Sequence, residues 1–399
     1  MKIARALAPR TLRSDSARPA APANAPARPF ARCEVHTTIE DARAPWAELE
    51  ACAIAPPYQG FAFLNAWRGT VGRACGVTPF IVVGRDAAGT VNALLPFGVT
   101  RVGPLAIASF LGGKDANFNM GLYRPGVAAD GPALRDLLRR AAAMGAPRIA
   151  GFHCLNQPVA WEGVANPMAA LGGRPSPSAG HKTAPGLDFP VWLNAHYSRE
   201  AHKKLRKKTQ RLDALGPLKH RIARDSASTR GILAAFAAQK DARMRELGLG
   251  RRWNRDLYLA FLAEAAEAGS LELHALSCGE RIVAVFGGLA RGDRLCGMFI
   301  SHDGDPQIAR CSPGELLLNE IIRDLTERRF ATFDLGVGEA RYKTHCCEAE
   351  EPLFDTFVAT RLSGHVMGAT LLASLRVKRF VKQTPAVWRL VERMRRRTR

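Results

Sequence analysis

A repeated order of secondary-structure signals constrains the fold of this chain more than any other feature. In each half, helical segments, a hairpin, a strand, a helix and a further strand follow one another. Residues 89–98 align with residues 279–288 at an offset of 190, and Ile149 aligns with Phe333 at an offset of 184. Strands that alternate with helices indicate α/β architecture. We therefore expect two α/β lobes of similar topology, with chance similarity of two α/β segments as the alternative.

The repeat also makes a specific prediction about equivalent positions. Superposing the strands around Val91 and Ile282 should bring the helices around Leu134 and Leu318 into register. A first lobe of unrelated topology would contradict this prediction.

Changes in composition divide the 399 residues into five predicted segments. Residues 1–32 are rich in Ala, Pro and Arg, which predicts a disordered basic tail. The first lobe is expected over residues 33–165, and a linker rich in Pro, Gly and Ser over residues 166–187. The second lobe is expected over residues 188–362, followed by a basic amphipathic tail over residues 363–399.

The net charge of +21 is concentrated in three places. Seven basic residues lie in residues 1–32, eleven lie in residues 361–399 and seven lie in residues 199–211, against one acidic residue in each range. The rest of the chain is close to neutral. This distribution argues against a nucleic-acid-binding core and favours charged ends that contact a polyanion, including an anionic membrane surface.

The basic stretch after Ser198 has the spacing of a helix. Ala201, Leu205, Leu212 and Leu215 form a narrow apolar stripe that would dock on the lobe, and cations occupy the remaining positions. Those cations either form a solvated face or contact an anionic substrate, a CoA phosphate or a tRNA. Residues 365–399 place apolar residues among arginines, which indicates helices that lie on an anionic bilayer or pack on the protein's own surface.

The nine cysteines contain no CxxC pair, which is typical of reduced thiols in a cytosolic protein. Neither His302-Asp303 nor the segment His345–Glu348 has a second pair at ligand spacing, so no metal site is expected. No apolar run approaches the roughly 18 residues of a membrane span. We therefore expect a cytoplasmic protein, with peripheral contact at the inner membrane as an extension.

One helix start has the features of an anion site. Ser312 stands at the expected N-cap, Pro313 at the first helical position and Glu315 three residues after the cap, which is the pattern of a capping box. Unpaired N–H groups at a helix start attract anions, and Arg310 would add a positive charge. The alternative is an ordinary helix start with no ligand.

The next strand carries the candidate catalytic groups. Asp334 lies at the end of an apolar strand, Gly336 follows it, and the pair Tyr342-Lys343 comes shortly after. Open α/β sheets place ligands and catalytic groups at the carboxyl ends of strands. Asp334 is therefore a candidate base or substrate orienter, and capping of the loop backbone is the structural alternative.

These elements resemble a known family. The stretches HKKLRKKTQRLDALG, FAAQKDAR, GERIVAVFGG, SPGELLLNEIIRDL and FDLGVGEARYK occur in that order within residues 202–343. Together they resemble the GNAT-type domain of the CelD/BcsL (cellulose-biosynthesis-associated) acetyltransferases, which are related to the FemAB-type acyltransferases. The resemblance covers residues 188–350 well. It extends more weakly to the first half through residues 79–97 and 109–123.

The resemblance implies tandem GNAT-like lobes, mixed sheets flanked by helices, and acyl-CoA, most simply acetyl-CoA, as a co-substrate with no permanent cofactor. By the family pattern, the CoA pyrophosphate would bind at Arg310, Ser312, Gly314 and Glu315, although Arg310 stands one residue out of register. Asp334 would act as base or orienter, Tyr342 would protonate the leaving thiolate, and Lys343 would hold the oxyanion or a phosphate. A covalent intermediate on Cys311 is the less favoured route.

The expected reaction is direct transfer of an acyl group to an amine or hydroxyl of an envelope or exopolysaccharide-related acceptor, in a bacterial cell. A FemAB-like enzyme that takes aminoacyl-tRNA is one alternative. A non-catalytic accessory protein of polysaccharide biosynthesis, with basic ends that contact membrane or RNA, is the other. The sequence contains no motif that identifies the acceptor.

Overall fold

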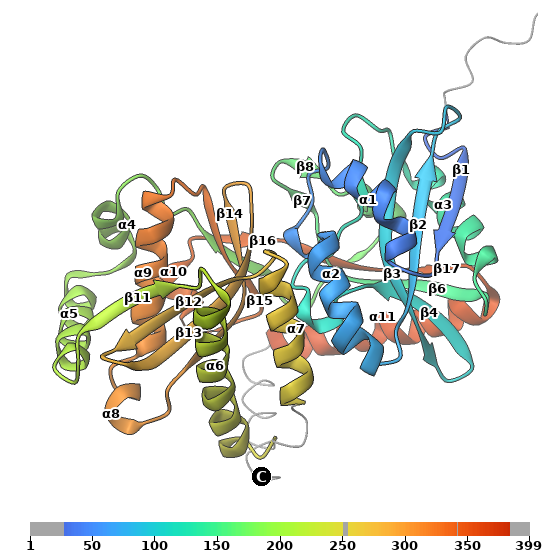
Figure 1. Cartoon of the computed structure of the whole chain (residues 1–399). Coiled ribbons are helices and arrows are strands. Elements are labelled where there is room, and N and C mark those ends of the chain that lie inside the picture. Colours follow the sequence, from blue (N-terminus) through green and yellow to red (C-terminus); the bar gives the residue numbers. More distant parts are fainter. Residues whose placement is uncertain (1–27, 250–253, 341, 384–399) are drawn as a thin grey trace, which may run out of the picture.

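A computed structural model describes residues 28–249, 254–340 and 342–383. Two α/β lobes stand side by side, the first in blue and cyan and the second in green to orange (Figure 1). The predicted disordered tail falls almost entirely on residues 1–27, and the end of the predicted basic tail falls on residues 384–399. Both stretches lie outside the described residues.

The first lobe is built on one mixed sheet in which β1, β2, β3, β4 and β6 are neighbours in that order. Its main elements are β1 (Arg32–His36), α1 (Arg43–Glu50), α2 (Phe61–Trp67), β2 (Thr78–Arg85), β3 (Val91–Val102), β4 (Leu105–Phe110), β5 (Leu122–Tyr123), α3 (Gly131–Met144) and β6 (Ile149–Pro158). Three short strands follow: β7 (Ala160–Trp161), β8 (Val164–Ala165) and β9 (Arg174–Pro175).

The second lobe repeats this plan, with β11, β12, β13, β14 and β15 as neighbours. It begins with β10 (Gly180–Thr183), α4 (Phe189–His196), α5 (Arg199–Asp213), β11 (Leu218–Ile222), α6 (Ser226–Glu246) and α7 (Arg255–Glu267). It continues with β12 (Glu272–Cys278), β13 (Arg281–Arg291), β14 (Arg294–His302), α8 (Pro306–Ala309), α9 (Pro313–Glu327), β15 (Thr332–Val337), α10 (Lys343–Cys346) and β16 (Ala349–Glu351).

The two lobes correspond strand by strand, which confirms the prediction of two α/β lobes of similar topology. β3 and β13 occupy the same place in their sheets, as do β4 and β14. β4 and β6 are parallel, and α3 lies between them in sequence. β14 and β15 are likewise parallel, and α9 lies between them in sequence. The expected equivalence of the helices around Leu134 and Leu318 therefore holds in the topology.

Each sheet is completed by a strand from outside its predicted segment. β17 (Leu353–Ala359) pairs antiparallel with β6 of the first lobe, and β10 pairs antiparallel with β15 of the second. The expected linker, residues 166–187, thus contains a strand of the second sheet, and the expected second lobe contains a strand of the first. A single cut between two lobes does not describe this chain, because β17 follows the second lobe in sequence and completes the sheet of the first.

The last described helix, α11 (Leu362–Gln383), packs on the first lobe and begins inside the predicted basic tail. A Cβ on Gly364 would lie 1.9 Å from the carbonyl oxygen of Ala150, and a Cβ on Gly368 would lie 2.4 Å from Phe357. Glycine at both positions therefore allows this close approach. None of the helices in the described ranges combines the length and the apolar character needed to cross a bilayer.

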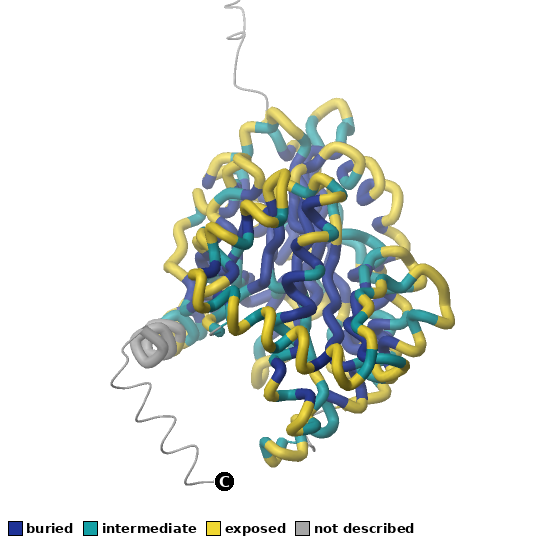
Figure 2. The backbone as a smooth tube through the Cα atoms, turned by 90° about the vertical axis from the view of Figure 1, so that its left-hand side faces the viewer, coloured by how far each residue is buried: buried dark blue, intermediate teal, exposed yellow. Residues whose placement is uncertain are grey.

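The central strands are buried and the connections are exposed, as Figure 2 shows in dark blue and yellow. One apolar cluster spans both lobes, and within it Phe63 of α2 meets Phe261 of α7 edge to face at 5.5 Å. A second cluster lies on the other face of the second sheet under α9. The shared cluster joins the lobes into one body.

A histidine pair links the edge of the second sheet to α9. His220 Nε2 lies 3.0 Å from His274 Nδ1, and His274 Nε2 lies 2.7 Å from a carboxylate oxygen of Glu272. Arg328 binds both oxygens of Glu272, at 2.7 and 3.0 Å. Ligand atoms of Glu272, His274 and Asp324 lie within 4.8 Å of one another, and Arg328 already neutralises these acids.

This pair predicts acid sensitivity. Burial, with His274 as a second cause, lowers the pKa of His220 from 6.5 to about 4. The unfolded chain therefore binds a proton that the folded chain does not, and stability should fall as the pH drops from about 6.5 to about 4. The shift corresponds to about 3 kcal/mol at most, and partial exposure reduces the expected loss to about 2 kcal/mol.

Urea unfolding of wild type and His220→Gln at a series of pH values tests this expectation. The decrease in the free energy of unfolding between pH 6.5 and 4 should be smaller in His220→Gln. It should be unchanged in His365→Gln, a control at an exposed histidine. An equal decrease in wild type and His220→Gln would show that His220 does not cause the acid sensitivity.

Candidate functional site

The two central parallel strands of the second sheet separate at their carboxyl ends. β14 and β15 are paired from Arg294 and Thr332 as far as Cys296 and Asp334, and no pair follows. β14 is buried up to Gly297 and half-buried from Met298 to Ser301. The separation leaves backbone groups of both strands without a strand partner, so an extended ligand can insert there.

The first lobe reaches this point of separation. The carbonyl oxygen of Gly297 accepts hydrogen bonds from Tyr58 Oη at 3.0 Å and from Asn117 Nδ2 at 2.8 Å. Asn117 Nδ2 also lies 3.1 Å from Tyr58 Oη. These side chains occupy the place where a strand amide would otherwise pair with Gly297.

A β-bulge follows directly. Gly288 faces Gly297 and Gly287 faces Phe299, so Met298 has no opposite residue on β13. Bulges redirect backbone groups and are frequent next to active sites. The Gly297–Met298 peptide is therefore a distinctive feature of this strand end.

The start of α9 lies on the apolar side of the second sheet, and Gly314 faces Ile300 of β14. The predicted capping box is wrong. Ser312 has a left-handed backbone (φ 53°, ψ 57°) and its side chain makes no cap hydrogen bond, while Glu315 pairs with Lys208 of α5. The Gly314 N–H donates to no backbone carbonyl in the part of the chain that the structure describes, and Arg310 is exposed.

Asp334 is completely buried, and both of its oxygens are engaged. Oδ2 lies 2.7 Å from Arg294 Nη2, and Oδ1 accepts the Gly336 N–H at 2.6 Å. Burial raises the pKa of this carboxyl, whereas Arg294 and the Gly336 N–H lower it. A general base must reach its proton directly or through one water, and in this structure Asp334 contacts Arg294 and its own turn instead.

Arg294 extends this buried network toward the first lobe. Its guanidinium stacks 3.6 Å from the centre of the Trp161 ring and pairs with Glu351 at 3.1 Å. Glu351 in turn pairs with Lys182 of β10 at 2.8 Å. The network thus joins β14, β15 and β10 under the site.

Tyr342 and Lys343 lie at α10, after the glycine turn. Lys343 is 4% exposed, and its Nζ donates to the carbonyls of Gly336 (2.9 Å), Val337 (3.3 Å) and Gly338 (2.9 Å). Burial lowers the pKa of Lys343 and raises that of Tyr342 to about 12. Lys343 therefore holds the turn closed, and Tyr342 carries its proton at neutral pH.

The basic stretch is α5, capped by Ser198, whose Oγ accepts the Ala201 N–H at 3.3 Å. Leu212 is fully buried and Leu205 half-buried, as predicted, whereas Leu215 is 49% exposed. Lys208 lies beside the start of α9 through its pair with Glu315. The exposed cations of α5 are Arg199, Lys203, Lys204, Arg206, Lys207 and Arg211.

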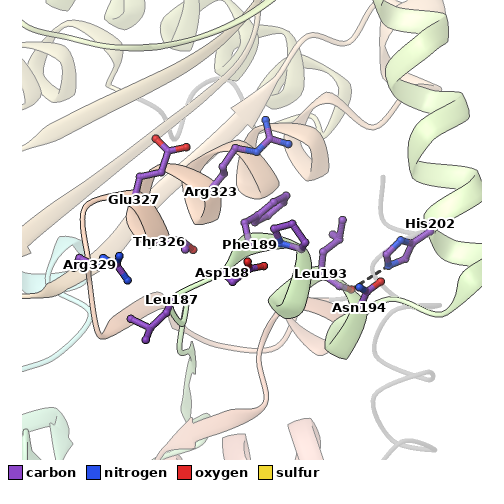
Figure 3. A pocket seen from close by; sticks show the side chains of 11 residues that line it. Leu187, Asp188, Phe189, Leu193, Asn194, His202, Arg323, Thr326, Glu327 and Arg329 are labelled. Carbon is purple, nitrogen blue, oxygen red and sulfur yellow. Dashed lines mark hydrogen bonds between the residues drawn. The ribbon is translucent and has the colours of Figure 1, made fainter.

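A cavity of about 700 Å³ opens at the other end of α9, between that helix and α4 (Figure 3). Its lining includes Arg323, which is nine residues or about 14 Å along the helix from Gly314. Three of its polar groups have partners, because Asp188 caps α4, His202 bonds to the Leu193 carbonyl and Arg323 pairs with Glu320. None of the predicted site residues lines it, so the strand separation is the better candidate site.

Sequence reasoning missed Tyr58, Asn117 and Arg294. Tyr58 and Asn117 are separated from Gly297 by 239 and 180 residues, and neither belongs to a periodic or motif pattern. Asp334 in an apolar strand does predict a cationic partner such as Arg294, because a buried carboxylate needs one.

Comparisons with known proteins agree with this geometry. A family model described as an acetyltransferase (GNAT) domain matches residues 199–344. FemX is similar in structure, with 11% identity, a TM-score of 0.58, and coverage of 84% of this chain and 100% of FemX. A conserved protein of unknown function from Bacteroides thetaiotaomicron has 12% identity, a TM-score of 0.51, and coverage of 83% and 100%.

A tandem GNAT protein from the clavulanic acid biosynthesis pathway also matches, with 11% identity, a TM-score of 0.46, and coverage of 83% of this chain and 99% of that chain. No curated protein matches in sequence. The structural likenesses concern the fold, and the family model concerns the second lobe. Residues 199–344 therefore match an acetyltransferase (GNAT) domain, and this match supports acyl transfer as the activity of the second lobe.

Proposed function

We propose that this protein transfers an acyl group, most simply acetyl, from acyl-CoA to an amine or hydroxyl of an envelope or exopolysaccharide-related acceptor. The observation that carries the proposal is the separation of β14 and β15 beyond Cys296 and Asp334, next to the start of α9, within the matched domain. The pantetheine arm is extended and carries amides, so it can pair with the unpartnered strand backbone.

The start of α9 is the proposed site for the phosphate end of the donor. Among the described residues the Gly314 N–H has no backbone acceptor, Ser312 is half-buried beside it, and Arg310 is exposed to solvent. Lys208 and the exposed cations of α5 add positive charge on the same side. A helix start with neighbouring cations is a favourable site for a pyrophosphate.

The transfer step needs no covalent enzyme intermediate. The acceptor nitrogen or oxygen attacks the thioester carbon, its proton passes to a base, and the resulting tetrahedral intermediate breaks the C–S bond. The departing thiolate takes a proton, and Tyr342 is the proposed donor because its raised pKa keeps the hydroxyl protonated at neutral pH. Asp334 and Lys343 are proposed to contribute indirectly, by holding the backbone of the Gly336–Gly338 turn in place.

Two further readings remain proposals. The exposed cations of α5 favour a FemAB-like use of aminoacyl-tRNA, since six of them are exposed on one helix. If the protein is a non-catalytic accessory protein, no acyl donor binds at the strand separation. A cytoplasmic location with contact at the inner membrane fits a basic C-terminal segment and an acceptor made at that membrane.

Gly314→Asp tests the donor site. The new carboxylate would lie beside the proposed pyrophosphate, so acetyl-CoA affinity, measured by calorimetric titration, should fall at least tenfold, the effect of losing about 1.5 kcal/mol or more.

Gly314→Ala is the matched control. A Cβ at this position meets only Ile300, at 3.7 Å, so the alanine variant should bind acetyl-CoA within about threefold of wild type. Wild-type affinity in Gly314→Asp would place the donor elsewhere. Binding of aminoacyl-tRNA but not acetyl-CoA by the wild type would favour the FemAB-like reading.

A further inference from the structure

We infer that the first lobe limits the length of the acyl group, because its Tyr58 and Asn117 close the inner end of the strand separation. The inner end is the point at which β14 and β15 part, directly after Cys296 and Asp334. The inference rests on the proposed function, since it takes the separation as the donor site. It adds the substrate class, an acyl-CoA with an acetyl or similarly short chain, and the residues that select it.

The proposed position of the phosphates decides where the acyl group lies. The start of α9 is beside the carboxyl end of β14, because a Cβ on Gly314 would lie 3.7 Å from Ile300. A donor held there by its phosphates extends back along residues 298–301 of β14, which are half-buried and have no pair on β15. The acyl group is at the far end of the pantetheine arm, so it reaches the inner end of the separation.

Side chains of the first lobe fill that inner end. A Cβ on Gly336 of β15 would lie 3.1 Å from the Gly297 carbonyl oxygen of β14, so the two strands approach closely there. The same Cβ would lie 2.6 Å from Asn117 Nδ2, which donates to that carbonyl at 2.8 Å. Tyr58 Oη lies 3.0 Å from the carbonyl oxygen and 3.1 Å from Asn117 Nδ2. An amide and a hydroxyl thus occupy the space between the strands.

Buried aromatic rings pack behind these two groups. Tyr58 is fully buried, and its ring centre lies 5.7 Å from that of Phe63 and 6.1 Å from that of Phe118. Phe118 follows Asn117 in sequence, is fully buried and packs on Trp161 at 5.1 Å. Methylene groups forced into a well-packed interior are destabilising. An acetyl methyl can end at the Asn117 amide, whereas a longer chain would have to displace that amide or the Tyr58 hydroxyl.

The segment that carries Asn117 is fixed to the first lobe on both sides. Asp115 accepts the indole N–H of Trp67 at 3.0 Å, two residues before Asn117. Asn119, two residues after it, donates its backbone N–H to the Asn156 carbonyl at 3.0 Å. Because both flanks are held, the Asn117 amide cannot withdraw from the separation without breaking contacts in the first lobe.

The test compares wild type with Asn117→Ala, Tyr58→Phe and the control Asn119→Ala. Calorimetric titration gives the affinity of each protein for free CoA, acetyl-CoA, butyryl-CoA and hexanoyl-CoA. Each acyl-CoA affinity is divided by the affinity of the same protein for free CoA, so that a general effect on donor binding cancels. The control removes an amide that bonds to the Leu155 carbonyl within the first lobe.

In the wild type, the corrected affinity for butyryl-CoA should be at least about tenfold weaker than that for acetyl-CoA, because the extra methylene groups overpack the inner end. In Asn117→Ala the difference should fall below about threefold, since the space of the removed amide accepts them. Tyr58→Phe should reduce the difference less, because it removes a single oxygen atom. Hexanoyl-CoA should stay weak in every variant, and Asn119→Ala should discriminate like the wild type.

Equal corrected affinities for acetyl-CoA and butyryl-CoA in the wild type would overturn the inference. Wild-type discrimination in Asn117→Ala, or its loss in Asn119→Ala, would overturn it too. Failure of the proposed function looks different, because the wild type would then bind neither CoA nor acetyl-CoA, and the inference would fall with it. Thermal unfolding of each variant identifies loss of fold, and Asn117→Ser takes the place of Asn117→Ala if the alanine variant unfolds.

Discussion

Asp334→Asn is expected to lower the free energy of unfolding by about 3 kcal/mol, because removing one partner of a buried ion pair leaves the other charge poorly compensated. Arg294 is 3% exposed and would keep only Glu351, which already pairs with Lys182. The substitution also alters the acceptor of the Gly336 N–H. Urea denaturation followed by circular dichroism measures this change in the free energy of unfolding.

A matched control is Glu320→Gln, which removes the charge from a pair with the largely exposed Arg323 and should cost less than about 1 kcal/mol. The double variant Asp334→Asn with Arg294→Met should recover part of the loss, because the stranded charge is gone. If Asp334→Asn unfolds like the wild type and only its acyl transfer falls about 100-fold, Asp334 is a base or substrate orienter after all.

The sequence was sufficient to predict the order of elements, because apolar periodicity and turn residues are local. The hairpin at Asp86–Gly89 illustrates this, since Asp86 accepts the Thr90 N–H and Gly89 has a φ of 94°. The pairing of β10 with β15 and of β17 with β6 could not be predicted in the same way. β10 and β17 are short strands whose partners are set by the tertiary fold, at separations of about 150 to 200 residues.

The candidate site was predictable as a region and not as a set of contacts. The helix start at Pro313 was located correctly from local pattern, whereas Asp334 lies inside β15, which continues to Val337, and only the pairing with β14 ends at Asp334. The capping box failed because the chain leaves α8 and enters α9 within three residues, and the left-handed backbone of Ser312 accomplishes this reversal. The roles of Arg294, Tyr58 and Asn117 depend on contacts between distant segments, on which local sequence carries no information.

Lys343→Met gives the second large effect, expected at about 3 kcal/mol in the free energy of unfolding. The ammonium group supplies three hydrogen bonds to the carbonyls of Gly336, Val337 and Gly338, and methionine leaves these carbonyls without that donor in a buried turn. The glycines have φ values of 77° and 98°, so the turn has little intrinsic preference for this shape. Amide hydrogen exchange should show faster opening at Gly336 and Gly338.

The same variant separates two roles for Lys343. A lysine that holds the turn affects unfolding and hydrogen exchange first, and acetyl-CoA affinity only through the displaced Gly336. A lysine that holds the oxyanion or a phosphate leaves unfolding unchanged and weakens the donor or slows transfer. Lys219→Met on the exposed edge of the second sheet controls for loss of one charge. Because three hydrogen bonds tie Lys343 to its own turn, we expect the first pattern.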